Sequence, residues 1–342
     1  MASAAPSPWL SSRAFDLAVY ATSPIWAAVG VLALAHVVEP LHMFYAFNIV
    51  FTIVHYGPTW LRVYCDREER ARHRVSIYVF PAAVIAFAWL TYDRPEVLAF
   101  IIFIWDRWHA VMQNYGFLRL YDAKAGTSSR TRARRDLALL ISSALLILSL
   151  NMGLFAPVLD ALAAIGLAPV TSTTVVRGIQ IGLAAATAVC AIAWLRDARR
   201  GDPAQPGRQH PRWIYLACVI GGHAMMNLTT NIFVLSSQEK VYHSLQYVAL
   251  SWHYGKRRAT APATSQAAGR AFRAVFSATR WPVYAVAIAA WTAAAWLLNS
   301  RLGLHARGPG LFSLAISVMA PCHYYFDSFL WRVRRPEVRA SL

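Results

Sequence analysis

The segment EVLAFIIFIWDRWHAVMQNYGFLRLYD, residues 96–122, combines a long apolar run with a stripe of polar side chains. Asp106, His109 and Gln113 follow one another at intervals of three and four residues, so an α-helix would place them on one face. About 20 predominantly apolar residues are enough for a helix to cross the hydrocarbon core of a bilayer. Polar side chains at that depth are costly unless they face the interior of a helical bundle and find partners there. The segment therefore predicts a membrane-spanning helix with one polar, inward-facing side.

The whole chain is apolar and basic in the same way. Its 342 residues are 57% hydrophobic and 14% charged, whereas soluble globular domains have about 45–50% apolar and about 25% charged residues. The 33 Lys and Arg residues outnumber the 16 Asp and Glu residues, which gives a formal net charge of +17. This composition excludes a disordered or fibrous chain, and it favours a polytopic membrane protein over a nucleic-acid-binding protein. The four cysteines form no CxxC motif, which argues against a disulfide framework or a thiolate zinc site.

Further apolar stretches with short polar breaks predict the other membrane-spanning helices. The expected spans are 15–37, 41–62, 75–93, 96–119, 136–157, 174–195, 213–236, 240–256, 281–299 and 311–331. With both termini in the cytoplasm, most of the 33 basic residues fall in inward-facing loops, as the positive-inside rule requires. The sequence thus predicts an all-α, polytopic integral membrane helical bundle of about ten transmembrane helices, with residues 1–342 forming one domain.

Two other segments also lead to structural expectations. The apolar stretch 158–172 contains Gly166 and Pro169 and predicts an interfacial or re-entrant connection. The charged segment YCDREERARHR, residues 64–74, predicts a solvated, salt-bridged surface in which His73 has no further role.

Several histidines are expected at membrane depth. At a rise of about 1.5 Å per residue, five of them lie about 11–19 Å from the cytoplasmic ends of five different predicted helices. These candidate metal ligands are His55, His109, His223, His243 and His323. His253 lies nearer the inner mouth and is a weaker candidate, and His42 lies toward the outer face, where its role stays open.

Companion side chains at helical spacing strengthen this pattern. Thr59 follows His55 by one turn, and Asn227 and Asn231 continue the face of His223. Asp106, three residues before His109, and Gln113 are expected to orient histidines, as carboxylates beside metal ligands commonly do. Asp327, one turn after His323, is a further candidate ligand. Together these stripes predict a polar, imidazole-lined pocket toward the inner side of the bundle.

The side chains expected in this pocket favour a particular metal. Imidazole binds iron, copper and zinc, while His, Asp, Gln and Asn without thiolates favour non-haem iron. One or two iron ions are both compatible with the sequence. Three alternatives remain: haem ligated by two of the histidines, a proton or ion path, and histidines that only hydrogen-bond neighbouring helices.

Four segments resemble a bacterial family of polytopic, histidine-rich membrane proteins that is uncharacterised. They are HYGPTWLRVYCDREERARHR, WHAVMQNYGFLRLYD, HSLQYVALSWHYGKRR and HYYFDSFLWRVRRPEVR. In architecture the chain is also loosely similar to the Brp/Blh β-carotene 15,15'-dioxygenases, a resemblance that implies iron held by histidines from separate helices. The resemblance to the bacterial family implies a multi-pass protein of the bacterial inner (plasma) membrane. The chain lacks the HxxxH and HxxHH boxes of membrane desaturases and alkane hydroxylases, which argues against membership in that superfamily.

The leading functional hypothesis is an iron-dependent oxidoreductase of the oxygenase type. Iron would activate O₂, and an apolar chamber would position a lipid or isoprenoid hydrocarbon against it. A cytoplasmic ferredoxin could supply electrons at the basic inner surface. One rival is a transporter or channel lined by the histidines, Arg107 and Arg177, with helix breaks at Gly57–Pro58 and Gly221–Gly222. The other rival is a haem-binding electron-transfer subunit.

Overall fold

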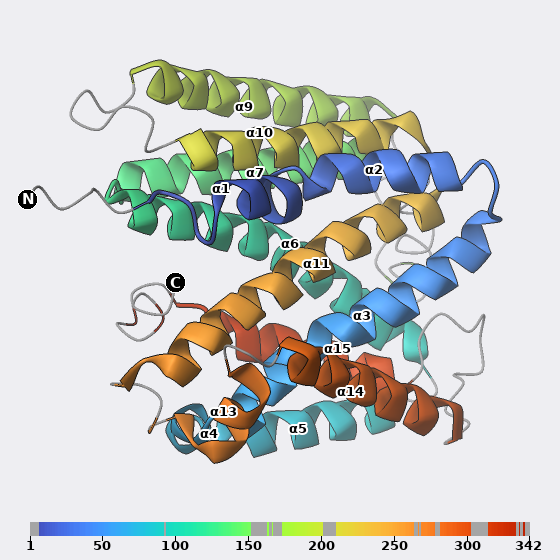
Figure 1. Cartoon of the computed structure of the whole chain (residues 1–342). Helices are drawn as coiled ribbons and strands as arrows, with labels where there is room; N and C mark the ends of the chain where they lie inside the picture. The colour runs from blue at the N-terminus through green and yellow to red at the C-terminus, as the bar shows by residue number, and fades with distance from the viewer. Residues whose placement is uncertain are drawn as a thin grey trace, which may run out of the picture. The chain divides into compact units, whose positions relative to one another are not determined.

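The computed structural model describes most of the chain, and all of the regular elements in that part are helices (Figure 1). The described residues are 7–91, 94–151, 163, 166, 173–200, 210–262, 266, 268–277, 281–301, 314–332, 335 and 338. Over these residues the all-α prediction is confirmed. The expected connection at 158–172 lies outside them, apart from residues 163 and 166.

The chain folds into two compact units. Unit 1 comprises Met1–Tyr45 and Ala110–His243, and unit 2 comprises Ala46–His109 and Ser244–Leu342. Three long helices belong partly to each unit: α3 (Pro40–Cys65), α6 (Pro95–Ala125) and α11 (Ile232–Thr260). The expectation of a single domain over 1–342 stays a prediction.

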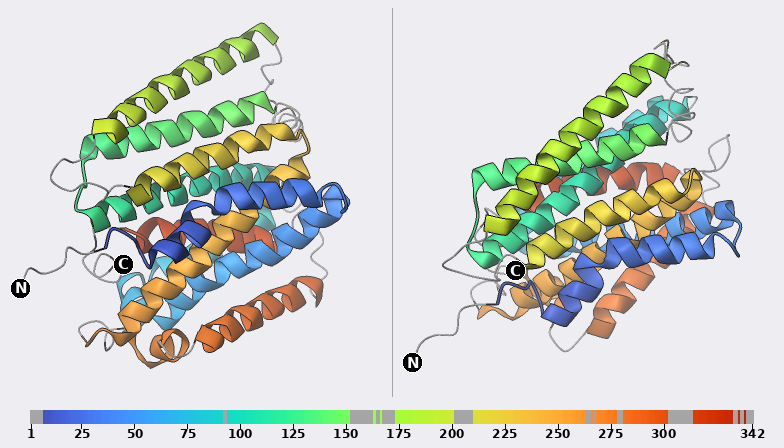
Figure 2. Two further views of the ribbon diagram at one scale, coloured as in Figure 1. Left: turned by 45° about the horizontal axis from the view of Figure 1, so that its top comes forward. Right: turned by 90° about the horizontal axis from the view of Figure 1, so that it is seen from above.

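Unit 1 is built from helices at the N-terminus and in the middle of the chain. They are α1 (Arg13–Phe15), the π-helix η1 (Asp16–Ala21), α2 (Ser23–Leu34), α7 (Arg130–Leu150), α9 (Thr173–Arg200), α10 (His210–Met225) and the 3₁₀ turn η3 (Met226–Leu228). Helix α10 packs against both α2 and α7, and α7 packs against α9 (Figure 2). A Cβ on Gly222 of α10 would lie 2.8 Å from the backbone oxygen of Pro24, so the glycine permits the close approach of α10 to α2.

Unit 2 contains α4 (Arg67–Arg72), α5 (Ser76–Leu90), α13 (Arg270–Phe276), α14 (Trp281–Arg301) and α15 (Leu314–Leu330). Helix α15 packs against α5 and α14. One apolar cluster joins α15 to α3 and α5 through Val63, Ile77, Val84, Cys322, Phe326, Phe329 and Leu330. A second joins α15 to α3, α5 and α6 through Tyr56, Ala88, Leu98, Ile102, Ala320 and Tyr324. These two clusters fix α15 beside the helices that carry the candidate ligands of unit 2.

Helices α3 and α15 run parallel with a constant register. Thr59 contacts Asp327 and Arg62 contacts Leu330, and the partners in both pairs are 268 residues apart. The rings of His55 and His323, which have the same offset, lie 4.4 Å apart between centroids. Because the offset does not change along the pair, successive turns of one helix meet successive turns of the other.

The predicted span 213–236 is wrong in its second half. Helix α10 ends at Met225, and after η3 the side-chain Oδ1 of Asn231 accepts hydrogen bonds from the backbone N–H groups of Phe233 (2.9 Å) and Val234 (3.4 Å). Asn231 therefore starts α11 as its N-cap, since a short side-chain oxygen can satisfy the first free amides of a helix. His223, Asn227 and Asn231 do not lie on one helix face.

The helices do not by themselves show a ten-span bundle. Among the described residues, Thr173–Arg199 of α9 is the one helix long and apolar enough to cross a membrane, and α1–η1 with α2 would add a second span bent by 49°. Helix α5 and the Trp281–Ala295 part of α14 are apolar but shorter. In α3, α6 and α11, the polar stripes and charged ends that suggested a site also lower the mean hydropathy.

Gly255 of α11 provides a test of the packing in unit 2. A Cβ at this position would overlap the ring of Phe276, which is 1% exposed, so the Gly255→Ala variant should lose about 1–3 kcal/mol of unfolding free energy. Thermal or denaturant unfolding of the purified protein, followed by circular dichroism, measures the loss. Gly116→Ala is the matched control, because a Cβ there meets no atom within 4 Å and should be neutral or stabilising. Equal stability of the two variants would contradict the packing of α13 on α11.

Candidate metal centre

Two histidines and one aspartate of unit 2 direct potential metal ligands at one another. His109 Nε2 lies 3.1 Å from His323 Nε2, and His323 Nε2 lies 3.6 Å from Asp327 Oδ2. One ligand atom from each of the three residues lies within 4.8 Å of the other two. His109 and His323 are 7% and 0% exposed, and the Asp327 side chain is 8% exposed. The group is thus almost completely removed from solvent.

Helical spacing and the packing of α6 on α15 bring these three side chains together. His323 and Asp327 are one turn apart on α15, so both project from the same face of that helix. His109 comes from α6, whose Leu98 and Ile102 pack in the same apolar cluster as Ala320 and Tyr324 of α15. The rings of His109 and Tyr324 lie 4.8 Å apart between centroids, which adds a contact next to the ligand atoms.

The spacing of the two imidazole nitrogens fits a shared ion. Nitrogen ligands about 2.1 Å from one metal ion, at the angles of octahedral or tetrahedral geometry, stand about 3.0–3.4 Å apart. The observed 3.1 Å between His109 Nε2 and His323 Nε2 is in this interval. A hydrogen bond between one protonated and one unprotonated nitrogen has the same length. The distance therefore permits a metal ion, and it also permits a directly bonded histidine pair.

The other polar atoms of His323 and Asp327 have partners of their own. His323 Nδ1 lies 2.8 Å from Thr59 Oγ1. Asp327 Oδ1 accepts hydrogen bonds from the Tyr247 hydroxyl (2.6 Å) and the Thr59 hydroxyl (3.0 Å). Trp331 Nε1–H in turn donates to the Tyr247 oxygen at 3.2 Å. Partners of this kind orient metal ligands in known centres, and they leave Nε2 and Oδ2 directed at the common point.

His55 is the nearest further candidate ligand in unit 2. Its side chain is 3% exposed, and its ring centroid lies 4.4 Å from that of His323 and 5.8 Å from that of His109. The structure thus brings together four of the residues that the sequence predicted for the site: His55, His109, His323 and Asp327.

Asp106 lies near this group but makes its described contacts elsewhere. Its Oδ1 accepts a 2.7 Å hydrogen bond from the Tyr324 hydroxyl, and its Oδ2 pairs with Arg107. Through Tyr324, whose ring packs on His109, Asp106 supports the histidine indirectly. The prediction that Asp106 orients His109 by a direct bond stays a prediction.

Three of the other predicted residues belong to unit 1. Gln113 Nε2 donates to the backbone carbonyl of His243 at 2.9 Å, and His223 Nε2 lies 3.3 Å from the Tyr242 hydroxyl. His243 itself is buried and is the last residue of unit 1, so its role as a ligand stays a prediction. Within the described part of the chain, His223 belongs to no group of three potential ligands.

His253 and His42 also form no such group among the described residues. His253 Nδ1 lies 3.0 Å from the carbonyl oxygen of Ala249, one turn earlier on α11. The His42 side chain is 81% exposed and pairs with Glu39 at the start of α3.

No protein-family model, no curated protein and no solved structure matches this chain. The interpretation of the site therefore rests on its geometry, and the family resemblance stays an expectation.

Sequence reasoning missed the importance of Thr59, Tyr247 and Trp331 for Asp327. Thr59 is on the His55 face of α3, which was a usable signal. Tyr247 and Trp331 are aromatic residues in a chain with 13% aromatic content, so nothing in the sequence distinguished them from packing residues.

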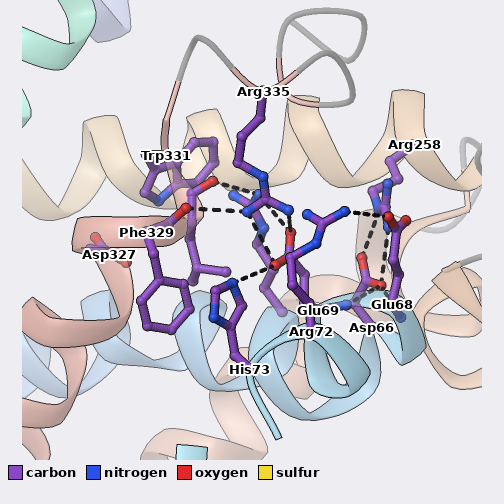
Figure 3. A network of polar contacts seen from close by, with 12 residues as sticks. Asp66, Glu68, Glu69, Arg72, His73, Arg258, Asp327, Phe329, Trp331 and Arg335 are labelled. Atoms are coloured by element: carbon purple, nitrogen blue, oxygen red, sulfur yellow. Dashed lines mark hydrogen bonds and ion pairs between the residues drawn. The ribbon is translucent and has the colours of Figure 1, made fainter. Parts of the chain in front are cut away.

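A buried charge cluster borders the site at Trp331 (Figure 3). We define it as Asp66, Glu68, Glu69, Arg258 and Arg335. Arg258 donates to Asp66 at 2.6 and 3.1 Å and to Glu68 at 2.8 Å, while Arg335 donates to Glu69 at 2.7 Å. Asp66 and Glu69 are 0% and 1% exposed. The prediction of a solvated, salt-bridged surface at 64–74 holds for its exposed arginines, such as Arg72, which pairs with Glu68 at 2.6 Å. It is wrong for Asp66 and Glu69, because Arg258 and Arg335 come from distant segments and pair with these buried carboxylates.

Arg62 connects the charge cluster to the site. Its Nη2 donates to the Leu330 carbonyl at 2.8 Å and lies 3.5 Å from Glu69 Oε1. The guanidinium carbon lies 4.5 Å from the Trp331 ring centroid and 3.9 Å from that of Tyr254. His73, expected to have no role, stacks on Phe329 with centroids 3.9 Å apart.

The carboxylate of Glu69 should make unfolding pH-dependent. Burial alone would raise the pKa of Glu69, but the guanidinium groups of Arg62, Arg335 and Arg258 outweigh it and hold the pKa below its ordinary value of 4.5. A lowered folded-state pKa contributes stability above pH 4.5 that is lost as the pH falls below that value and through the folded pKa. Thermal unfolding between pH 7 and pH 3 should show this loss.

The Glu69→Gln variant should be destabilised by about 3 kcal/mol near pH 7, because it leaves buried arginines without their counter-charge. Its stability should also fall less steeply in acid. Glu68→Gln is the control, since the Glu68 side chain is 33% exposed and its loss should cost about 1 kcal/mol or less. A Glu69→Gln protein with the wild-type acid profile would contradict the assignment.

Proposed function

We propose that this chain is a multi-pass membrane oxidoreductase that holds non-haem iron at His109, His323 and Asp327 and uses O₂ to oxidise an apolar lipid or isoprenoid. The observation that carries the proposal is the convergence of His109 Nε2, His323 Nε2 and Asp327 Oδ2 in a buried part of unit 2. When bound, the ion would supply the binding and activation of O₂.

The donor set supports iron more than other metals. Two imidazoles and one carboxylate that leave coordination positions open are typical of non-haem Fe(II) oxygenases, whereas structural zinc sites have four protein ligands and often use thiolates. Cys322 is buried in an apolar cluster with Val63 and Phe326 and belongs to no ligand group among the described residues. We include His55 as an additional ligand; His223, His243 and His253 stay proposed ligands of this ion or of a second one.

The geometry gives less support to the rival functions. Two axial histidines on opposite sides of a haem iron would hold their ligand atoms about 4 Å apart, which is wider than the 3.1 Å between His109 and His323. For transport, Gly57–Pro58 and Gly221–Gly222 were the expected helix breaks, yet both pairs lie inside continuous helices, α3 and α10. Arg177, which the transport hypothesis placed along a polar path, is exposed on α9.

A lipid environment is supported by the distribution of apolar and polar side chains. Ile85 and Trp89 of α5 are 54% and 76% exposed, and Val286 of α14 is 66% exposed. In the same unit, Arg258 and His323 are completely buried. Soluble domains bury their large apolar groups and expose their charges, so this inverse pattern favours outer faces in contact with hydrocarbon.

Helix direction supports the proposed topology of about ten spans with cytoplasmic termini. In that topology the second and tenth spans both run inward, and they correspond to α3 and α15, which run parallel. The basic inner surface would suit a cytoplasmic electron donor of the ferredoxin type. We propose no nucleic-acid partner, and place the protein in the bacterial inner membrane.

Metal analysis tests the centre. Wild-type protein purified in detergent should contain about one iron per chain or more by mass spectrometry, and His109→Ala and His323→Ala should lose most of it, because a lost ligand leaves too few donors. His42→Ala, which changes the same residue type at an exposed position outside the proposed ligands, should keep it. Wild-type protein that stays metal-free after anaerobic loading with Fe(II) would leave His109 and His323 as a hydrogen-bonded pair and overturn the proposal.

Cysteine accessibility tests the membrane assignment. In a background with the four native cysteines replaced by alanine, Ile85→Cys should resist a membrane-impermeant maleimide in native membranes, because lipid covers α5. Lys256→Cys, exposed at the end of α11, should react in inside-out vesicles. Both should react after denaturation. Equally fast labelling of the two positions in intact membranes would contradict a lipid-facing α5.

A further inference from the structure

Thr59 is a single buried hydroxyl that contacts both proposed ligands of α15. Its side chain is 0% exposed. Thr59 Oγ1 lies 2.8 Å from His323 Nδ1 and 3.0 Å from Asp327 Oδ1, and it also contacts the hydroxyl of Tyr247. The constant register of α3 and α15 brings this residue beside Asp327 and one turn from the His55–His323 pair.

The hydrogen-bond directions follow from counting protons. A carboxylate that binds a metal ion is ionised, so Asp327 Oδ1 can only accept, and hydrogen bonds to a charged acceptor are the stronger ones. The single Thr59 proton is therefore directed at Asp327 Oδ1. The Thr59 oxygen can then only accept from His323, so His323 Nδ1 must carry a proton.

This assignment determines the chemistry of the other ring nitrogen. A neutral imidazole with a proton on Nδ1 has its lone pair on Nε2. His323 Nε2 is the atom that faces His109 Nε2 at 3.1 Å and Asp327 Oδ2 at 3.6 Å. The hydrogen bonds of Thr59 thus direct one lone pair from each ligand of α15 at the position proposed for the ion.

We propose that Thr59 is a positioning residue that fixes the metal-binding tautomer of His323 and the orientation of Asp327. This inference rests on the proposed function, since it assigns a role around the same ion. Tyr247 contributes to the orientation of Asp327 but not to the tautomer of His323. Its hydroxyl donates to Asp327 Oδ1 at 2.6 Å, and the contact that directs the His323 tautomer comes from Thr59.

The test compares metal affinity in wild type, Thr59→Val, Thr59→Ser and Tyr247→Phe. Thr59→Val keeps the shape of the side chain and removes the hydroxyl, and loss of a partner of this kind typically weakens metal binding by about 10–100-fold. Thr59→Ser retains the hydroxyl and should bind within about threefold of wild type. Competition of Fe(II) or Co(II) against a chromophoric chelator measures each affinity.

A second readout separates positioning from a general loss of structure. The visible absorption of the Co(II)-loaded protein reports the ligand geometry, and it should change in Thr59→Val and be restored in Thr59→Ser. Circular dichroism and thermal unfolding of the metal-free proteins check that the variants are folded. Tyr247→Phe should weaken binding less than Thr59→Val, because it leaves the His323 Nδ1 partner in place.

The outcomes distinguish this inference from the proposed function. Metal-free wild-type protein after loading would overturn both. Loaded wild type with a Thr59→Val variant of equal affinity and unchanged Co(II) spectrum would overturn only the role of Thr59. Loss of affinity in Thr59→Val and in Thr59→Ser alike would also overturn it, because the retained hydroxyl would then have no effect.

Discussion

The ring nitrogens of His109 and His323 face each other at 3.1 Å, and both side chains are buried. Two lone pairs at that distance repel each other unless a proton or a metal cation lies between them. At an exposed site, water molecules would hydrogen-bond to both nitrogens and remove this repulsion. In a buried site the helices α6 and α15 can pack this closely only with such a cation or proton present. The side chain of Asp327 supplies a third potential ligand atom for such a cation.

The surrounding side chains hold Asp327 and His323 in place through hydrogen bonds and packing. Thr59 and Tyr247 satisfy one oxygen of Asp327, and Trp331 satisfies the oxygen of Tyr247. Buried polar groups persist when each has a partner, and partly satisfied networks are costly. In unit 2, the aromatic rings of Tyr56 and Tyr324 also contact His323, with centroids 4.8 and 5.7 Å away.

Helical spacing in the sequence predicted the all-α fold and a substantial part of this group. Asp327 follows His323 by one turn, a relation that holds in any helix and so needs no tertiary information. The bonds of Thr59 and Tyr247 to Asp327 join residues 268 and 80 positions apart, and no local pattern encodes them.

The position of Asn231 was mispredicted for a different reason. A polar residue three or four positions after another can continue a helix face or can be the N-cap of the next helix. Only the three-dimensional structure shows which of the two applies. The same holds for Asp66, whose charged neighbours in sequence suggested solvent while Arg258 covers it in the fold.

The parallel register of α3 and α15 links the charge cluster to the site. Arg62 is three residues beyond Thr59, and Leu330 is three residues beyond Asp327, so the Arg62–Leu330 hydrogen bond lies about one turn from the Thr59–Asp327 bond. Arg62 also lies against Glu69, which holds Arg335 beyond the end of α15. A slip of α15 by one residue would break the Arg62–Leu330 and Thr59–Asp327 hydrogen bonds and would displace Arg335 from Glu69. Through these contacts Arg62 and Arg335 help to hold α15 in the register at which His323 and Asp327 face His109.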